Sequence, residues 1–125
     1  MKEKRILIVD DLKFNIDFES KLIQTIMKSY DYQLTIDEAT SIKEALEKIE
    51  TEAPYDAMII DMNLPDGSGV QIAKEVKKKT KLTRIAALTI YPCEYEKERE
   101  LFDMFLKKPL VMEAFKRNIK QLLSL

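Results

Sequence analysis

Three aspartates, one threonine and a pair of lysines end or directly follow short apolar stretches of the chain: Asp10, Asp11, Asp61, Thr89, Lys107 and Lys108. The two adjacent aspartates follow "RILIV", and the third follows "AMII". The threonine and the lysine pair end two further apolar stretches downstream, and either lysine could supply the ammonium. If these stretches form parallel strands, their carboxyl ends meet at one edge of a sheet, where ligands bind in such folds. We therefore expect three carboxylates, a hydroxyl and an ammonium to lie together there.

Three clustered carboxylates repel one another, and their pKa values rise unless a cation joins them. Oxygen ligands suit a hard cation, so Mg²⁺ fits best, with Mn²⁺ as a second candidate. A magnesium-bound aspartate beside a lysine is suited to accepting a phosphoryl group, since phosphoryl transfer depends mainly on positioning and charge neutralisation. One carboxylate would be the nucleophile, giving an aspartyl phosphate. Thr89 and a lysine would hold the phosphoryl oxygens.

Each of these residues also has a plainer interpretation. An Asp-Asp pair between a strand and a helix is often only a helix N-cap with a solvated neighbour. Asp66, in "LPDG", has the sequence context of a turn residue. Thr89 also suits an ordinary strand, and Phe105 suits a packed core. The combination of positions, more than any single residue, favours a metal and phosphoryl site.

Composition indicates one folded domain without a general affinity for nucleic acid. The chain has 125 residues, of which 46% are apolar and 34% charged, with 21 basic and 22 acidic side chains. A net charge of -1 gives no reason to expect direct nucleic-acid binding. No apolar run approaches the roughly 20 residues that span a bilayer, and no secretory signal is recognisable. Cys93 is the single cysteine, which fits a reducing, cytoplasmic setting.

Two absences exclude whole classes of chemistry. The chain has no histidine, which removes Ser-His-Asp triads, His-ligated zinc sites and a phosphohistidine carrier. Only two glycines are present, and neither a G-x-G-x-x-G motif nor a G-x-x-x-x-G-K-[ST] phosphate loop occurs. Any chemistry must therefore use carboxylates, hydroxyls and lysines.

Apolar runs and amphipathic stretches alternate five times along the chain. The predicted strands are residues 5–10, 32–39, 55–61, 84–89 and 104–107. Helices are predicted over 14–27, from the capping box Ser41/Glu44 to residue 49, from a second capping box Ser68/Gln71, over 93–102 and over 111–123. Strict alternation predicts an α/β fold: a single doubly wound domain, (βα)₅, with a five-stranded parallel sheet and helices on both faces.

Four motifs carry a resemblance to a known family. "ILIVDD", "IIDMNLPDGSG", "ALT" and "KKP" resemble the motifs of the receiver (response regulator) domain of two-component signalling, the CheY-like superfamily. They occur in the family's order and with nearly its spacing, and the resemblance covers the whole chain. It implies one receiver domain, residues 1–125, with the flavodoxin-like strand order 2-1-3-4-5.

The resemblance also implies residue roles. Asp61 would be the phosphoacceptor, with Asp10, Asp11 and the backbone carbonyl of Asn63 as further magnesium ligands. The remaining implied roles are Lys108 as the phosphate-contacting lysine, Thr89 and Phe105 as the switch pair, and Lys108–Pro109 as a cis peptide. Asn15 also matches a common family residue, and we expect it to cap or orient the first helix.

Two features depart from the family's usual pattern. Ile90 follows Thr89 where the family mostly has alanine or another small residue, so we expect slower phosphotransfer or hydrolysis. The gap of 19 positions between Thr89 and Lys108 is short, which predicts a shortened or irregular fourth helix.

The implied function is a phosphorylation-activated switch. A sensor histidine kinase or a histidine phosphotransfer protein would donate to Asp61, and the modified domain, as a monomer or a phosphorylation-dependent dimer, would then bind a downstream effector protein. Such a domain catalyses only its own phosphorylation and dephosphorylation. The alternatives are a phosphorylation-independent interaction module, and a magnesium-dependent phosphohydrolase. The hydrolase usually requires D-x-D, whereas this chain has the adjacent pair in "VDDLK".

Overall fold

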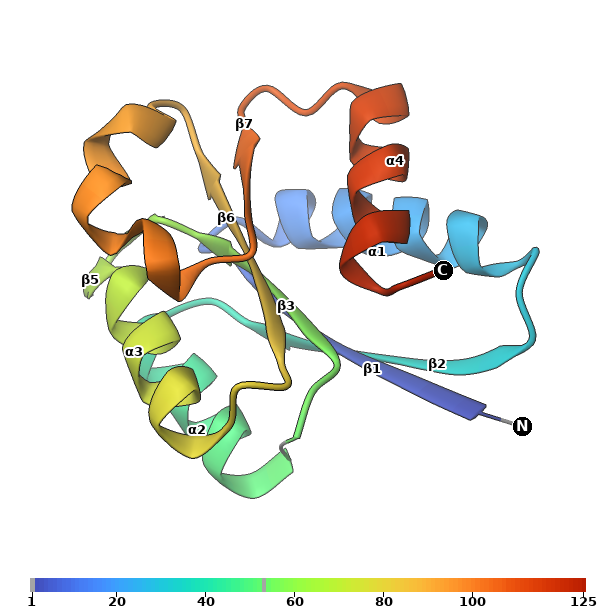
Figure 1. Cartoon of the computed structure of the whole chain (residues 1–125), viewed down its shortest axis with the longest axis horizontal. Helices are drawn as coiled ribbons and strands as arrows, with labels where there is room; N and C mark the ends of the chain where they lie inside the picture. The colour runs from blue at the N-terminus through green and yellow to red at the C-terminus, as the bar shows by residue number, and fades with distance from the viewer. Residues whose placement is uncertain (1, 53) are drawn as a thin grey trace.

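A five-stranded parallel sheet forms the centre of the molecule (Figure 1). The computed structural model describes residues 2–52 and 54–125. The strand order is β2-β1-β3-β6-β7, and every neighbouring pair is parallel. The predicted order 2-1-3-4-5 is therefore confirmed. The strands are β1 (Lys2–Val9), β2 (Tyr32–Ala39), β3 (Ala57–Asp61), β6 (Arg84–Thr89) and β7 (Met104–Lys107).

Helices cover both faces of this sheet, as the alternating sequence predicts. On one face lie α1 (Lys13–Met27) and α4 (Met112–Leu122), and on the other lie α2 (Ile42–Glu52) and α3 (Val70–Lys79) (Figure 1). Each face has its own apolar core. Among the described residues, no helix is both long and apolar enough to cross a lipid bilayer.

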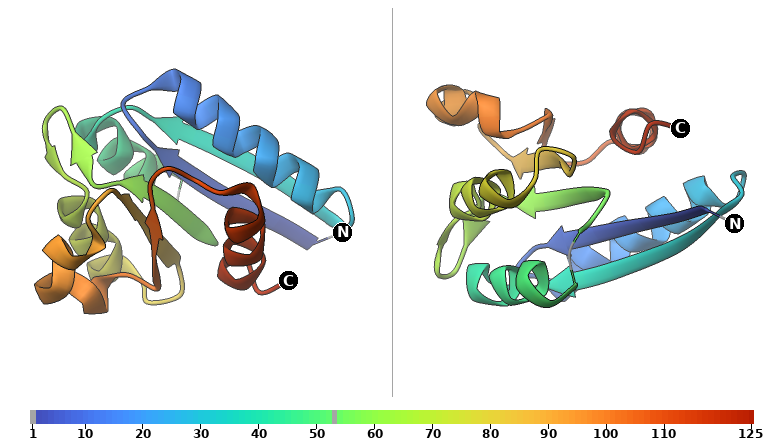
Figure 2. Two further views of the ribbon diagram at one scale, coloured as in Figure 1. Left: turned by 90° about the horizontal axis from the view of Figure 1, so that it is seen from above. Right: turned by 60° about the horizontal axis from the view of Figure 1, so that its bottom comes forward.

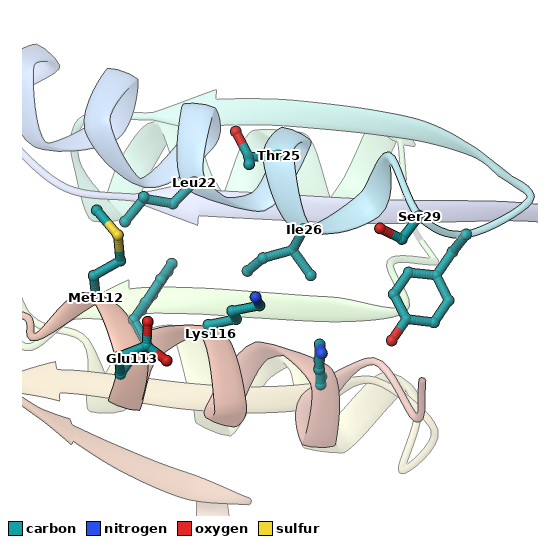
Figure 3. A pocket seen from close by; sticks show the side chains of 10 residues that line it. Leu22, Thr25, Ile26, Ser29, Met112, Glu113 and Lys116 are labelled. Carbon is teal, nitrogen blue, oxygen red and sulfur yellow. The ribbon is translucent and has the colours of Figure 1, made fainter.

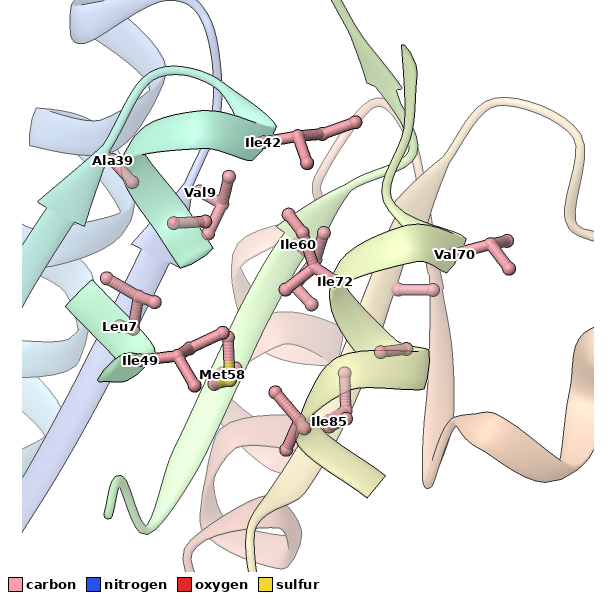
Figure 4. Packing of buried hydrophobic residues seen from close by; sticks show 14 of the residues in the cluster. Leu7, Val9, Ala39, Ile42, Ile49, Met58, Ile60, Val70, Ile72 and Ile85 are labelled. Atoms are coloured by element: carbon pink, nitrogen blue, oxygen red, sulfur yellow. The ribbon is translucent and has the colours of Figure 1, made fainter. Parts of the chain in front are cut away.

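Alternate side chains of the central strands enter opposite cores. Leu7 and Val9 pack with Ile60 and the helices α2 and α3 (Figure 4). Ile6 and Ile8 pack instead beneath α1 and α4. Because both faces of a parallel sheet are covered, its strands are apolar at consecutive positions and do not alternate with polar residues. This is the reason for the continuous apolar stretch before Asp10.

Strand boundaries agree closely with the sequence. β2, β6 and β7 have the predicted bounds, whereas β1 begins at Lys2 and β3 at Ala57. The longer β1 pairs with β2 over its whole length, from Lys2 opposite Tyr32 to Val9 opposite Ala39 (Figure 2). A two-stranded hairpin, β4 (Asn63–Leu64) and β5 (Gly67–Ser68), was not predicted.

The two predicted capping boxes have different outcomes. At α2, the Glu44 backbone N–H donates to the Ser41 hydroxyl at 3.1 Å, and the Thr40 N–H donates to the Glu44 carboxylate at 2.9 Å. The box predicted at Ser68 is wrong, because the N-cap position of α3 is Gly69, although the Ser68 hydroxyl accepts a hydrogen bond from the Val70 N–H at 3.2 Å. Gly69 lies so close to β3 that a Cβ there would be 2.6 Å from Ile60 Cγ2.

The segment predicted as the fourth helix is irregular, as the short spacing suggested. It forms η1 (Pro92–Leu101), a 3-10 helix with non-helical backbone angles at Tyr95. Its sequence is mostly polar, and it has no fully buried residue. A helix with little apolar surface gains little from packing against the sheet, and a regular α-helix is not stabilised there.

The inward face of α1 does not contain every apolar residue that recurs at helical spacing along it. The exposed fractions of Phe14 and Phe18, two of these residues, are 79% and 43%. The buried positions include Ile16, Glu19 and Ile23. Helical spacing from Ile16 includes Glu19 and Ser20, so a stripe traced through apolar residues alone was rotated away from the true inward face.

Candidate functional site

Three aspartates gather at the carboxyl ends of the two central strands. Asp10 follows β1 and Asp61 ends β3, and Val9 pairs with Ile60 between these strands. Carboxylate oxygens of Asp10, Asp11 and Asp61 lie within 4.8 Å of one another. Asp10 and Asp61 are almost fully buried, whereas Asp11 is exposed. Carboxylate oxygens this close form a donor set suited to a divalent cation of the magnesium type.

The surroundings of Asp10 leave its negative charge only partly compensated. Burial raises the pKa of Asp10, and the nearby charge of Asp61 raises it further. The Leu12 N–H donates to its carboxylate at 3.0 Å, and Asn15 Nδ2 lies 3.3 Å from the same oxygen. Both hydrogen bonds favour the ionised form and hold the group in place. Asn15 therefore orients the Asp10 carboxylate from the first turn of α1.

The two oxygens of Asp61 have different partners. The Asn63 N–H donates to Oδ1 at 3.0 Å, and Lys108 Nζ lies 3.2 Å from Oδ2. The Lys108 backbone N–H also donates to the Thr89 carbonyl at 2.9 Å, which ties the end of β7 to the end of β6. The predicted cis peptide between Lys108 and Pro109 is confirmed.

Thr89 and Phe105 occupy adjacent strands, as the predicted switch pair requires. Thr89 is the last residue of β6 and is buried, and its Oγ1 accepts a hydrogen bond from the Tyr91 N–H at 3.2 Å. Phe105 pairs across the sheet with Ala87, and its ring centroid lies 5.3 Å from that of Phe102. Phe105 also lines a cavity beneath η1. These are their resting positions, and the predicted switching roles remain predictions.

Sequence reasoning assigned Asp66 only to a turn, but its carboxylate also caps a distant helix. It accepts hydrogen bonds from the N–H groups of Ile42 and Lys43 at 2.9 and 3.1 Å. The bond from Ile42 is the main cause that lowers the pKa of Asp66. Asp66 thus joins the loop after Asp61 to the N-terminus of α2. The contact spans more than twenty residues, so no local pattern signals it.

Two cavities lie along α1. The first, of about 210 Å³, lies between α1 and α4, where Leu22 and Ile26 face Met112 and Lys116 (Figure 3). None of the predicted site residues lines it. The second, of about 580 Å³, is lined by Lys108, Asn15, Ile90 and Glu19 among others. Ile90 lines this cavity together with Lys108, and its side chain is half exposed. Its expected effect on the rates of phosphotransfer and hydrolysis remains a prediction.

Fold and site together define a class: a parallel α/β domain with an acidic cluster and a lysine at the carboxyl edge of its sheet. The chain matches the family model for the response regulator receiver domain over residues 6–120. It therefore belongs to the receiver domain family of two-component signalling. Domains of this family are generally signalling modules without a separate enzymatic activity.

Individual relatives agree with this assignment. The chain is 29% identical over 127 residues to hybrid signal transduction histidine kinase L of Dictyostelium discoideum, covering 94% of this chain and 7% of the kinase. A receiver domain (CheY-like) structure from Methylobacillus flagellatus superposes with a TM-score of 0.81 at 27% identity, covering 97% of this chain and 99% of that one. The response regulator TrrA from Thermotoga maritima, solved in complex with Mg(2+)-BeF, gives a TM-score of 0.73 at 33% identity, covering 95% and 98%.

Proposed function

We propose that residues 1–125 form one receiver domain that accepts a phosphoryl group on Asp61. The donor would be the phosphohistidine of a sensor histidine kinase or of a histidine phosphotransfer protein. One observation carries the proposal: the buried Asp61 carboxylate contacts Lys108 at 3.2 Å, and it lies in the same acidic cluster as Asp10 and Asp11. A nucleophile, a cation for the phosphoryl oxygens and a metal-type donor set are thus adjacent.

We infer that Asp10, Asp11, Asp61 and the Asn63 carbonyl hold Mg²⁺, with Mn²⁺ as a substitute. When bound there, the cation would supply positive charge that offsets the carboxylates and the negative charge of the transferring group. The acidic cluster fits this need, since burial and the neighbouring charge both raise the pKa of Asp10. The TrrA structure with Mg(2+)-BeF is consistent with the same metal chemistry.

Individual residues of the chain have separate roles in this reaction. An Asp61 oxygen attacks phosphorus while the bond from phosphorus to the donor's imidazole nitrogen breaks, and the imidazole leaves. The Lys108 ammonium, beside Oδ2, stabilises the negative charge on the phosphoryl oxygens. The buried position of Asp61 excludes most of the bulk water that would compete as the acceptor. The domain modifies itself and turns over no separate substrate.

Phosphorylation would then shift the resting state. The Thr89 hydroxyl, which accepts from the Tyr91 N–H at rest, would donate to a phosphoryl oxygen instead. Phe105 would repack against η1, changing the surface formed by η1, β7 and α4. A downstream effector protein, or a second copy of the domain, that binds this changed surface better would shift the population toward it.

The proposal is tested with a small phosphodonor. Wild-type protein incubated with acetyl phosphate and Mg²⁺ should gain one acid-labile phosphoryl group, detected by mass spectrometry. Asp61→Asn should abolish the modification, whereas Asp17→Asn, at an exposed position of α1, should leave it intact. A wild-type protein that is modified neither by small donors nor by histidine kinases would indicate an inert interaction module. Turnover of unrelated phosphoesters would indicate a hydrolase.

A further inference from the structure

Glu19 is a buried glutamate on the inward face of α1. Its exposed fraction is 1%, and its Oε1 is the one buried side-chain oxygen or nitrogen without a hydrogen-bond partner among the described residues. Ile16 and Ile23, one turn away on either side, are fully buried in the core. Leaving a carboxyl oxygen buried and unpaired is costly, and an apolar residue would pack there without that cost. A charged partner would therefore stabilise the carboxyl group of Glu19 at this position.

The charged groups around Glu19 belong to the phosphoacceptor site. Glu19 and Lys108 line the same cavity of about 580 Å³, together with Asn15 and Ile90. Burial raises the pKa of Glu19 to about 8, and the charges of Asp10 and Asp61 act in the same direction. Lys108 is the opposing cation, which lowers the pKa. These groups face Glu19 from the ends of β1, β3 and β7.

Lys108 has donor capacity to spare. Its ammonium carries three N–H donors, and one acceptor, Asp61 Oδ2, lies 3.2 Å away. Glu19 offers an unsatisfied oxygen beside the same cavity. The lysine side chain is flexible, and it lines the same cavity as Glu19.

We propose that Glu19 is a positioning residue whose carboxylate competes with Asp61 for the Lys108 ammonium and so sets how fast Asp61 is phosphorylated. The proposal rests on the proposed function. When Glu19 is neutral, Lys108 stays with Asp61 and with the incoming phosphoryl oxygens. When Glu19 is ionised, Lys108 is shared, and its stabilisation of those oxygens weakens. Ionised Glu19 also adds negative charge near an anionic donor, which acts in the same direction.

The kinetic test is a pH profile of Asp61 phosphorylation by acetyl phosphate at saturating Mg²⁺. The wild-type rate should fall about threefold or more as pH rises through about 8. Glu19→Gln, which keeps the shape and removes the charge, should show no such fall and should match wild type near pH 6.5. Glu19→Leu should behave like Glu19→Gln, and it serves if the amide variant folds poorly. Asp17→Asn, an exposed carboxylate on the same helix, should follow the wild-type profile.

A second measurement is independent of phosphorylation and of metal. The carboxyl carbon of Glu19 is titrated by NMR in metal-free wild type and in Lys108→Met. Removal of the cation should raise the Glu19 pKa, and an unchanged value would overturn the proposal. If the wild-type protein is phosphorylated and Glu19→Gln shows the same pH profile, the Glu19 proposal is also overturned, whereas the proposed function stands. An unmodified wild type would instead remove the proposed function, and the titration would still report whether the two residues are coupled.

Discussion

At the residue scale, the site is an arrangement of incompletely balanced charges. Asp10, Asp61 and Glu19 are buried acids, and Lys108 is the cation nearest to Asp61. Asn15 and the Leu12 N–H hold Asp10 without neutralising it. An apoprotein with this excess of negative charge is poised to bind a cation, because binding relieves repulsion that folding has already imposed.

Glu19 makes the stability of the protein depend on pH. Its pKa is about 8 in the folded protein against an ordinary 4.5. Below pH 4.5 the Glu19 carboxyl is protonated in both the folded and the unfolded protein, so its ionisation does not oppose folding. As pH rises from there through about 8, the unfolded chain ionises first, and the folded state loses relative stability.

We therefore expect Glu19→Leu to stabilise the protein increasingly over this pH range, by up to about 5 kcal/mol above pH 8. Urea unfolding of both proteins between about pH 4 and 9, without metal, measures the difference. Asp17→Asn should give a difference that changes little with pH over the same range. A wild-type-to-leucine difference that is constant with pH would show that Glu19 has an ordinary pKa.

At the element scale, the connection from β3 to α3 sets the position of Asp61, the proposed phosphoacceptor. Gly69 lies against the end of β3, where a Cβ would be 2.6 Å from Ile60 Cγ2 and 2.9 Å from the Asp61 carbonyl oxygen. Asp66 anchors the same connection to α2 by accepting two backbone hydrogen bonds. The β4–β5 hairpin is thus held at its turn by Asp66 and at the end of β5 by Gly69, and its first residue is Asn63, whose N–H donates to Asp61.

Gly69→Ala should push this connection away from β3. Overpacking of this kind costs about 1–3 kcal/mol, and we expect urea unfolding to give a free energy of unfolding lower by that amount. Displacement of the Asp61 backbone should also slow phosphorylation by acetyl phosphate. Lys74→Ala, on the exposed side of α3, controls for a change on the same helix. A Gly69→Ala protein with wild-type stability and rate would mean that the connection yields without disturbing Asp61.

At the scale of the whole molecule, the parallel sheet brings distant segments to one edge. The acidic cluster joins residues 10, 11 and 61, and Lys108 adds the end of β7. These residues come together only when β1, β3, β6 and β7 are assembled, so the unfolded chain has no comparable site. A ligand that binds only the folded state stabilises it by mass action.

Mg²⁺ should therefore stabilise the folded wild-type protein, which is measured as a rise in its melting temperature with Mg²⁺ concentration. The stabilisation should be about 2.7 kcal/mol at a free Mg²⁺ concentration one hundred times the dissociation constant. Asp10→Asn should weaken or remove this effect. Asp17→Asn should retain it, and NaCl at matched ionic strength should not reproduce it. Equal stabilisation of Asp10→Asn and wild type would place the cation elsewhere.

The sequence by itself determined the fold class, the strand order through its motifs, and the strand ends at which the proposed site residues lie. It could do so because strand ends follow from apolar runs, and the ends of parallel strands converge in any fold of this class. It predicted an irregular fourth helix from the short spacing between Thr89 and Lys108.

Only the tertiary structure decided which face of α1 is buried, where α3 begins and what Asp66 does. Each depends on contacts between residues far apart in the chain: Gly69 against β3, Asp66 on the backbone of α2, and Glu19 beside Lys108. Local patterns encode periodicity and turn chemistry, but the charge environment of a buried group depends on every element packed around it. For that reason Asp61 could be predicted from the sequence as the phosphoacceptor that we propose, whereas Glu19, which we propose tunes it, could not.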